Sequence, residues 1–304
     1  MDITIIGAGA MGSLFGSMLA KSGNRVFLAD IWKEHVNAIN EKGLGIEHNG
    51  KTERIGIKAS TSTHDAPKSD LVIVFVKSTQ TGEAAVQALT CLKESGMVLT
   101  VQNGMGNAET IAGFVDPGRV ITGTTSYGAT ILGPGLIRHA GAGPTLIGLW
   151  SEKSSYDLKK IKELFCSSGI DTTIAEDIHE IIWKKLVINV GINAITALTG
   201  IKNGGIFDLA VTRALVRSAV NEACEVARAH GITFSPSIAE QVFTVAKATG
   251  FNRSSMGQDV DHQRQTEIDA INGAVVRLAG EKNIHVPVNQ TLTALVETLQ
   301  NNYK

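Results

Sequence analysis

The N-terminal segment constrains the fold more than any other part of the chain. A short apolar run at residues 3–6 breaks into the sequence GAGAMG and then into a helical pattern that continues to about residue 20. Gly7 allows a tight turn from strand to helix, Gly9 lets the backbone approach a pyrophosphate, and Gly12 lets the helix pack closely on the strand. The first N–H groups of that helix are suited to binding phosphate oxygens, so we expect a dinucleotide here.

The segment after the glycines supports this interpretation. A second strand at residues 25–29 ends on Asp30, where an acidic side chain can accept a hydrogen bond from a free ribose 2′-hydroxyl. A carboxylate repels a 2′-phosphate, and the nearest basic residue is Lys33, so Asp30 favours NAD(H) over NADP(H). The alternative is an ordinary glycine-rich turn that binds no ligand.

The first half of the chain alternates strands and helices, which is typical of a Rossmann-like, doubly wound α/β sheet. The expected elements are a helix at 32–42, a β-hairpin around Asn49-Gly50, a buried strand at 71–76, a helix to about residue 93 and a strand at 97–101. Ligands bind at the carboxyl ends of such strands. We therefore expect Gly7, Asp30, Lys77 and Asn103, which stand at or just beyond strand ends, to share one crevice.

The pattern changes twice further along the chain. Residues 120–149 read as short antiparallel strands that extend the sheet edge, and a helix at 156–168 and a strand at 172–174 complete this half. Helical patterns follow at residues 178–198, 208–230, 237–247, 258–282 and 288–302. We expect a dinucleotide-binding Rossmann domain over residues 1–172 and an all-helical domain for substrate binding and catalysis over residues 173–304.

Composition limits the partners. The net charge of −1 gives no electrostatic reason to expect nucleic acid or an anionic membrane, so a small molecule is the expected partner. The three cysteines are far apart and odd in number, which predicts buried thiols in a reducing compartment rather than disulfides or a metal site. Without an N-terminal leader pattern or a long uninterrupted apolar stretch, we expect a cytoplasmic, untethered protein. Residues 208–230 could pack internally or against a second copy in a homodimer.

The most informative chemistry lies in the apolar helical pattern of residues 181–198. Lys185, Asn189 and Asn193 are spaced i, i+4 and i+8, so they lie along one helix face. A lysine and two amides in a buried helix cost several kcal/mol unless they face partners or a polar cleft, so the stripe predicts a ligand. A partly buried lysine suits a general acid for a carbonyl that is being reduced. The alternative is a lysine that extends to solvent and asparagines that cap neighbouring helices.

A second polar segment covers residues 252–276. Ser255 and Gln258 resemble a capping box that opens a helix. Glu267 stands beside Ile268 and Ile271, on or near the face that should enter the core, and could place a carboxylate in the cleft. The alternative is a surface acid and a purely structural serine. No spacing of histidine, cysteine or acidic residues indicates a metal site.

These residues, in this order, resemble the ketopantoate reductase (2-dehydropantoate 2-reductase) family. The matching motifs are GAGAMG at 7–12, FVK at 75–77, QNG at 102–104, WKKLVINVGIN at 183–193, N-x-SSM from residue 252 and TEID up to residue 269. The resemblance implies that Lys185 is the catalytic acid and that Glu267 anchors and orients the substrate. By the same matching, the substrate pocket is lined by Asn103, Asn189, Asn193, Asn252 and Ser255. The implied cofactor-binding residues are Gly7, Ala8, Gly9, Ala10, Met11, Gly12, Asp30, Lys77, Asn103 and Glu267.

The resemblance also implies a reaction. A hydride passes from a reduced nicotinamide to the C2 ketone of 2-dehydropantoate, which yields pantoate for pantothenate and coenzyme A synthesis. Family members generally use NADPH, whereas Asp30 favours NADH, so both cofactors stay open. Three rivals remain: a reductase of another 2-oxo acid, a β-hydroxyacid dehydrogenase, and a dinucleotide-sensing regulator without catalysis. The segment AEDIHEIIW lacks the glycine-rich helix start of the β-hydroxyacid group, and a sensor has no need of the lysine–asparagine stripe.

Overall fold

The computed structural model describes residues 1–151, 153–154 and 156–303 and contains two compact units. The first consists of Met1–Gln102 and Asn107–Ile178, and the second of Asn103–Gly106 and His179–Lys304. The division therefore follows Ile178, because the strand near residue 172 belongs to the sheet of the first unit. Asn103–Gly106 follow Gln102 of the first unit in sequence but belong to the second unit.

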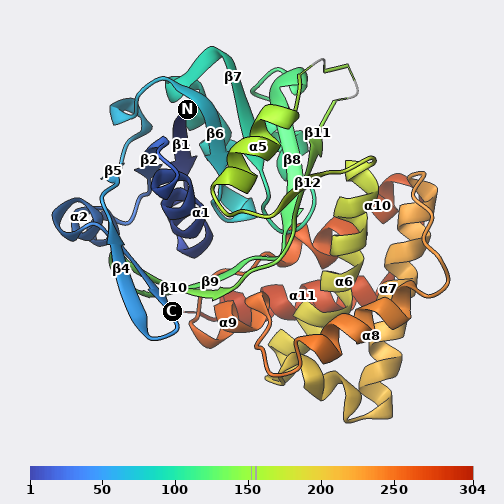
Figure 1. The fold of residues 1–304 in the computed structure, drawn as a ribbon. Coiled ribbons are helices and arrows are strands. Elements are labelled where there is room, and N and C mark those ends of the chain that lie inside the picture. The colour runs from blue at the N-terminus through green and yellow to red at the C-terminus, as the bar shows by residue number, and fades with distance from the viewer. Residues whose placement is uncertain (152, 155, 304) are drawn as a thin grey trace. The chain divides into compact units, whose positions relative to one another are not determined.

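The first unit holds all the strands that the structure describes (Figure 1). They are β1 (Asp2–Ile6), β2 (Arg25–Ala29), β3 (Leu44–His48), β4 (Lys51–Ile55), β5 (Lys58–Ser60), β6 (Ser69–Val74), β7 (Leu92–Thr100), β8 (Val120–Thr125), β9 (Gly128–Gly133), β10 (Leu136–Gly141), β11 (Thr145–Leu149) and β12 (Thr172–Ile174). Its α-helices are α1 (Ala10–Lys21), α2 (Lys33–Lys42), α3 (Thr81–Cys91), α4 (Asn107–Ala112) and α5 (Lys159–Ser167).

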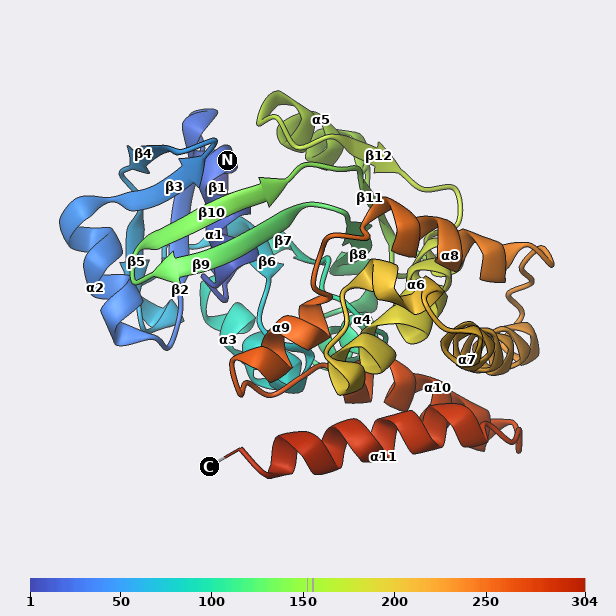
Figure 2. The ribbon, with the colours of Figure 1, turned by 90° about the horizontal axis from the view of Figure 1, so that it is seen from below.

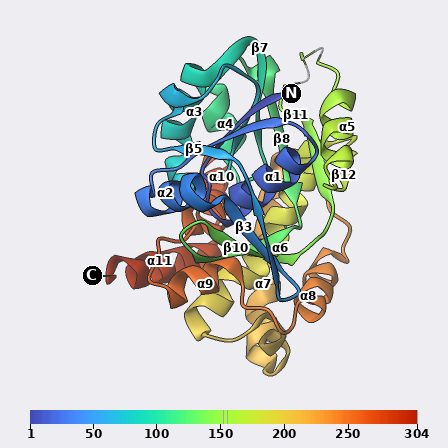
Figure 3. The ribbon, with the colours of Figure 1, turned by 60° about the vertical axis from the view of Figure 1, so that its left-hand side comes forward.

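The main sheet has eight strands in the order β12-β11-β8-β7-β6-β1-β2-β5. Its strand pairs are parallel except β8 with β11, so β1 lies between β2 on one side and β6 on the other, as a doubly wound sheet requires. Alternate residues of β1 face opposite sides: Ile3 and Ile5 pack with α1 and α5, whereas Ile6 packs with α3 and α4. Figure 3 shows α3 and α4 on one side of this sheet and α1 and α5 on the other.

The expectation that residues 120–149 extend one sheet edge is wrong for β9 and β10. These two strands join the β3–β4 hairpin in a separate sheet, in the order β4-β3-β10-β9, which covers α1 (Figure 2). The hairpin itself is confirmed, since Asn49 and Gly50 both have positive φ, at 50° and 77°. Only β8 and β11 remain in the main sheet, because strand partners distant in sequence are chosen by packing rather than by local pattern.

The second unit is helical throughout the part of it that the structure describes. Its α-helices are α6 (Ile178–Thr199), α7 (Ala210–Ala229), α8 (Ile238–Ala248), α9 (Ser255–Asp261), α10 (Asn272–Glu281) and α11 (Pro287–Asn301). α6 begins with the last residue of the first unit. It is long and apolar enough to span a membrane by length and composition, but 61% of its apolar window is buried, and Val187, Val190 and Ala194 lie in the unit's core. Its apolar character is therefore that of a core helix.

Two smaller expectations are wrong. The helix expected over residues 258–282 is two helices, α9 and α10, separated by a turn in which Gln263 has a φ of 52° and by a short 3₁₀ helix at Ile268–Ala270. Polar residues at 262–266 continued the helical pattern, but they surround an irregular connection. Of the three cysteines, Cys166 on the outer face of α5 is exposed rather than buried.

Candidate active site

The glycine turn joins the carboxyl ends of three strands of the first unit. Gly7, with a φ of 93°, donates its N–H to Ala29 O at 2.8 Å, and Phe75 donates to Ile6 O at 2.8 Å. A Cβ on Gly7 would lie 2.7 Å from the backbone of Phe75, and a Cβ on Gly12 would lie 1.9 Å from Gly7 O. Glycine is therefore required at both positions by the fold itself.

Gly9 differs from the other two glycines of the turn. A Cβ on Gly9 would meet nothing within 4 Å, so the fold alone tolerates a side chain there. The space beside Gly9 is open at the start of α1, whose first turn carries no acidic residue and whose N-cap makes no side-chain hydrogen bond. This open space against exposed helix N–H groups fits the approach of an anionic pyrophosphate.

A cavity of about 160 Å³ lies at the same strand ends. Gly7, Asp30 and Lys77 all line it, so the structure brings together three of the four residues expected in one crevice. The fourth, Asn103, belongs to the second unit. Asp30 Oδ1 accepts the Trp32 N–H at 2.9 Å, which orients the carboxylate at the end of β2.

Sequence reasoning missed several residues around this cavity. The cavity is also lined by Thr61, Phe75, Gln80 and Glu83. They follow the carboxyl ends of β5 and β6, and ligands of parallel sheets bind at such strand ends, so this tendency could have identified them. Gln102, in the QNG motif, has a structural role that the motif itself does not indicate. Its Nε2 donates to Val76 O at 2.7 Å, which ties the end of β7 to the segment after β6.

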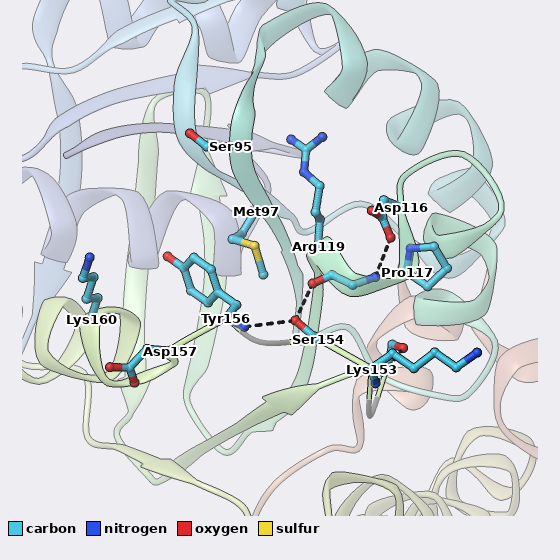
Figure 4. A pocket seen from close by; sticks show the side chains of 12 residues that line it. Ser95, Met97, Asp116, Pro117, Arg119, Lys153, Ser154, Tyr156, Asp157 and Lys160 are labelled. Atoms are coloured by element: carbon cyan, nitrogen blue, oxygen red, sulfur yellow. Dashed lines mark hydrogen bonds between the residues drawn. The ribbon is translucent and has the colours of Figure 1, made fainter.

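A larger cavity of about 780 Å³ lies at the opposite, amino-terminal side of β7 and β8 (Figure 4). Two of its polar side chains are bonded to the backbone: Ser154 Oγ donates to Gly118 O at 2.6 Å, and Arg119 donates to Gly96 O at 2.8 Å. None of the predicted site residues lines it. Ligands of parallel sheets bind at the other strand ends, so this cavity is not the candidate site.

The second unit carries the polar stripe on α6. Asn193 is 5% exposed, and Lys185 and Asn189 are half-buried among apolar neighbours. Among the described residues, no side-chain hydrogen bond is made by either asparagine. Burial lowers the pKa of Lys185 to about 8, and the negative charge of Glu267 acts in the opposite direction. The lysine can therefore gain and lose a proton near neutral pH.

A backbone hydrogen bond joins the two segments that carry Asn103 and Glu267. Glu267 is 8% exposed and directly precedes the 3₁₀ helix that ends at Ala270. The Met105 N–H donates to Ala270 O at 2.8 Å, and a Cβ on Gly104, whose φ is 81°, would lie 2.5 Å from that oxygen. The QNG motif therefore needs its glycine so that the chain after Asn103 can pack closely on Ala270, three residues after Glu267.

The remaining two predicted residues are exposed. Asn252 holds the loop before α9 through its backbone, since its carbonyl accepts the Asn203 N–H at 3.0 Å. The helix cap assigned to Ser255 is wrong: Ser254 is the N-cap, and its Oγ accepts the Gly257 N–H at 3.0 Å. Thr196 Oγ1 also donates to Ser254 Oγ at 2.7 Å, which fixes α9 to α6 and leaves Ser255 exposed.

Comparison with known proteins gives a consistent result for both units. Residues 3–152 match the family described as ketopantoate reductase PanE/ApbA, and residues 177–300 match its C-terminal domain. The chain belongs to this family. A 2-dehydropantoate 2-reductase of Halobacterium salinarum is 37% identical over 301 residues, covering 99% of both chains. One from Pyrococcus horikoshii is 39% identical over 298 residues, covering 98% of this chain and 97% of the relative.

Solved structures agree with this membership. A ketopantoate reductase of the PanE/ApbA family from Ralstonia eutropha is 31% identical with a TM-score of 0.92, covering 100% of this chain and 99% of the other. D-mandelate dehydrogenase, solved with NADH and anilino(oxo)acetate, is 30% identical with a TM-score of 0.93 and the same coverage. The expected family and fold class are confirmed, and the protein is an oxidoreductase with a nicotinamide cofactor.

Proposed function

We propose that the protein reduces the C2 ketone of 2-dehydropantoate to pantoate, with Lys185 as the acid. The observation that carries this proposal is a half-buried lysine with a pKa of about 8, with two asparagines on the same helix face. Full-length similarity to enzymes named 2-dehydropantoate 2-reductase supports the choice of substrate. The first unit would bind the dinucleotide, and the second would bind the substrate.

The roles of the residues follow from their chemistry. When bound, a reduced nicotinamide supplies a hydride to the ketone carbon. Lys185 donates a proton, or its charge, to the oxygen that becomes a hydroxyl, and its lowered pKa makes that donation easier near neutral pH. Glu267 anchors the substrate and keeps Lys185 protonated. Asn103, Asn189, Asn193, Asn252 and Ser255 are the amide and hydroxyl groups proposed to bind it.

The nucleotide is held by the first unit in this proposal. Gly7, Ala8, Gly9, Ala10, Met11 and Gly12 would receive the pyrophosphate, with Lys77, Asn103 and Glu267 beside the rest of the cofactor. We infer a preference for NADH, because the Asp30 carboxylate lines the cavity and Lys33 after it is exposed. A preference for NADPH greater than about tenfold in kcat/KM, roughly 1.4 kcal/mol, would refute this inference.

A second candidate is reduction of another 2-oxo acid. The similarity to D-mandelate dehydrogenase with bound NADH favours it, because that protein has the same fold at nearly the same identity as the ketopantoate reductase structure. Oxidation of NADH and of NADPH should be followed with 2-dehydropantoate, benzoylformate, pyruvate and 2-oxoisovalerate. The highest kcat/KM with 2-dehydropantoate supports the first proposal, and no turnover of it contradicts that proposal.

The same assay tests the catalytic group. Lys185→Ala should abolish turnover with the best substrate, and Lys184→Ala is the matched control, since Lys184 is a half-buried lysine on the same helix. We also propose that the protein works in the cytoplasm, which agrees with its three free cysteines.

A further inference from the structure

A buried histidine in the first unit has a role that none of the predicted site residues covers. His35 on α2 and Ser13 on α1 are both 0% exposed. Gly135, in the turn between β9 and β10, donates its N–H to His35 Nδ1 at 3.0 Å. Ser13 Oγ lies 3.3 Å from His35 Nε2 and 2.7 Å from Ala8 O, inside the glycine turn. The four residues form one hydrogen-bonded chain.

The donors in this chain can be assigned by elimination. A backbone N–H only donates, so His35 Nδ1 must accept from Gly135 and carries no proton. In the neutral ring the proton is then on Nε2, which donates to Ser13 Oγ. Ala8 O only accepts, so the single hydroxyl proton of Ser13 is donated to it. The opposite tautomer would place an acceptor at Nε2 and compete with Ala8 for that proton.

The direction of the Ala8 carbonyl sets the direction of the next N–H. Ala8 C=O and Gly9 N–H belong to one planar trans peptide and point in opposite directions. The carbonyl points to buried Ser13, so the Gly9 N–H points the opposite way, away from that buried side chain. A Cβ on Gly9 meets nothing within 4 Å, so open space lies beside this residue.

We propose that His35 is a positioning residue for the dinucleotide: through Ser13 it holds the Ala8–Gly9 peptide in the orientation that presents the Gly9 N–H to the pyrophosphate. The β9–β10 turn completes this hydrogen-bonded chain, because the Gly135 N–H holds His35 in the tautomer that is protonated on Nε2. Gly135 has a φ of 67°, and a Cβ on it would lie 2.8 Å from Ala38 on α2, so this turn and α2 are in close contact. The Gly45 N–H donates to Gly135 O at 2.8 Å and links the turn to β3.

The positioning of the Ala8–Gly9 peptide by His35 should depend on pH. Burial lowers the pKa of His35 below its usual 6.5, while Asp30 at the end of β2 and a hydrogen bond with the Ala8 backbone act in the opposite direction. Around the ring, α1 contributes Ser13 and the β9–β10 turn contributes Gly135, neither of which is charged, and Trp32 stacks on the ring at 5.0 Å. A protonated ring carries hydrogen on both nitrogens, so its Nε2 can still donate to Ser13, but its Nδ1–H now opposes the Gly135 N–H and drives the ring out of its place between α1 and the β9–β10 turn. The Gly135 contact that seats the ring is therefore intact at pH 7, and it is lost, with the positioning that depends on it, as the pH falls below the usual histidine range.

The test measures NAD⁺ binding by calorimetry at pH 5 to 8, without substrate. NAD⁺ lacks the 2′-phosphate, which would titrate near pH 6 and confuse the profile. The inference rests on the proposed function, and wild-type protein separates the two: failure of wild type to bind either NAD⁺ or NADP⁺ contradicts the proposed function. Binding by wild type with no effect of the variants contradicts only the role of His35.

Three variants decide the outcome. Ser13→Ala should weaken NAD⁺ binding about fivefold at pH 7, roughly 1 kcal/mol for one hydrogen bond. It should also reduce the acid limb of the profile, which is the loss of NAD⁺ affinity as the pH falls towards 5. His35→Leu should weaken it at least as much. His35→Gln keeps an N–H donor near the ε position and cannot titrate, so it should bind at pH 7 within about twofold of wild type and lose the acid limb. Thermal unfolding verifies that each variant is folded.

Two results would overturn the assignment. One is an unchanged dissociation constant in folded Ser13→Ala. The other is an acid limb that persists in His35→Gln, since another group would then be responsible. A purely structural histidine would lower the melting temperature of His35→Gln without changing the shape of its binding profile. If His35→Leu fails to fold, Ser13→Ala and His35→Gln still decide the question.

Discussion

Replacing Glu267 with glutamine should move the pH at which the reduction slows, and the structure gives the direction. Two influences act on the pKa of Lys185, which is about 8: burial lowers it from 10.5, and the carboxylate of Glu267 raises it. The reduction needs the protonated lysine, so kcat/KM of the wild-type protein should fall as the pH rises through about 8. Without the carboxylate only the lowering influence remains, so the fall should occur at lower pH.

The size of the change follows from the usual effect of a neighbouring charge. An opposite charge close by shifts a pKa by roughly 1 to 3 units, so its removal should lower the midpoint of the pH profile by about one unit or more. At pH 8 the protonated fraction then drops from about one half to about one tenth, whereas at pH 6 both proteins remain almost fully protonated. The ratio of kcat/KM at pH 6 to that at pH 8 should therefore rise about fivefold.

The assay is a pH profile of kcat/KM from pH 5.5 to 9.5, read from oxidation of the reduced cofactor. The midpoint is the quantity compared, because loss of substrate anchoring lowers the rate of Glu267→Gln at every pH. Asp269→Asn is the matched control, since Asp269 is an exposed carboxylate two positions further along the chain. A midpoint in Glu267→Gln equal to or above that of wild type would refute the reasoning.

Three further predictions concern single residues. Lys185→Ala should lower kcat at least about a hundredfold and leave the NAD⁺ dissociation constant unchanged in calorimetry. Gly12→Ala places a Cβ 1.9 Å from Gly7 O and should lower the free energy of unfolding by about 3 kcal/mol, whereas Gly9→Ala meets no atom and should keep the melting temperature while weakening NAD⁺ binding about tenfold. Glu222→Ala removes the carboxylate that accepts N–H groups of the first turn of α11 at 2.9 Å; urea unfolding should show a loss of about 2 kcal/mol, and kcat should not change.

Local sequence predicted the elements that carry the candidate site. The glycine turn, the strand that ends on Asp30 and the hairpin at Asn49-Gly50 depend on backbone freedom and residue alternation over a few positions. The stripe of Lys185 and its two asparagines depends only on helix periodicity. Such patterns involve neighbours in the chain, so they can be read without knowing what packs against them.

Contacts between distant segments decided the rest. The pairing of β10 with β3, the break before Glu267 and the transfer of Asn103 to the second unit depend on partners distant in sequence. Ser254, rather than Ser255, caps α9 because Thr196 of α6 bonds to it. Sequence alone named the lysine and the glycines. Only the tertiary structure set the pKa of that lysine and placed a buried histidine behind the glycine turn, because burial and hydrogen-bond partners exist only once the chain has folded.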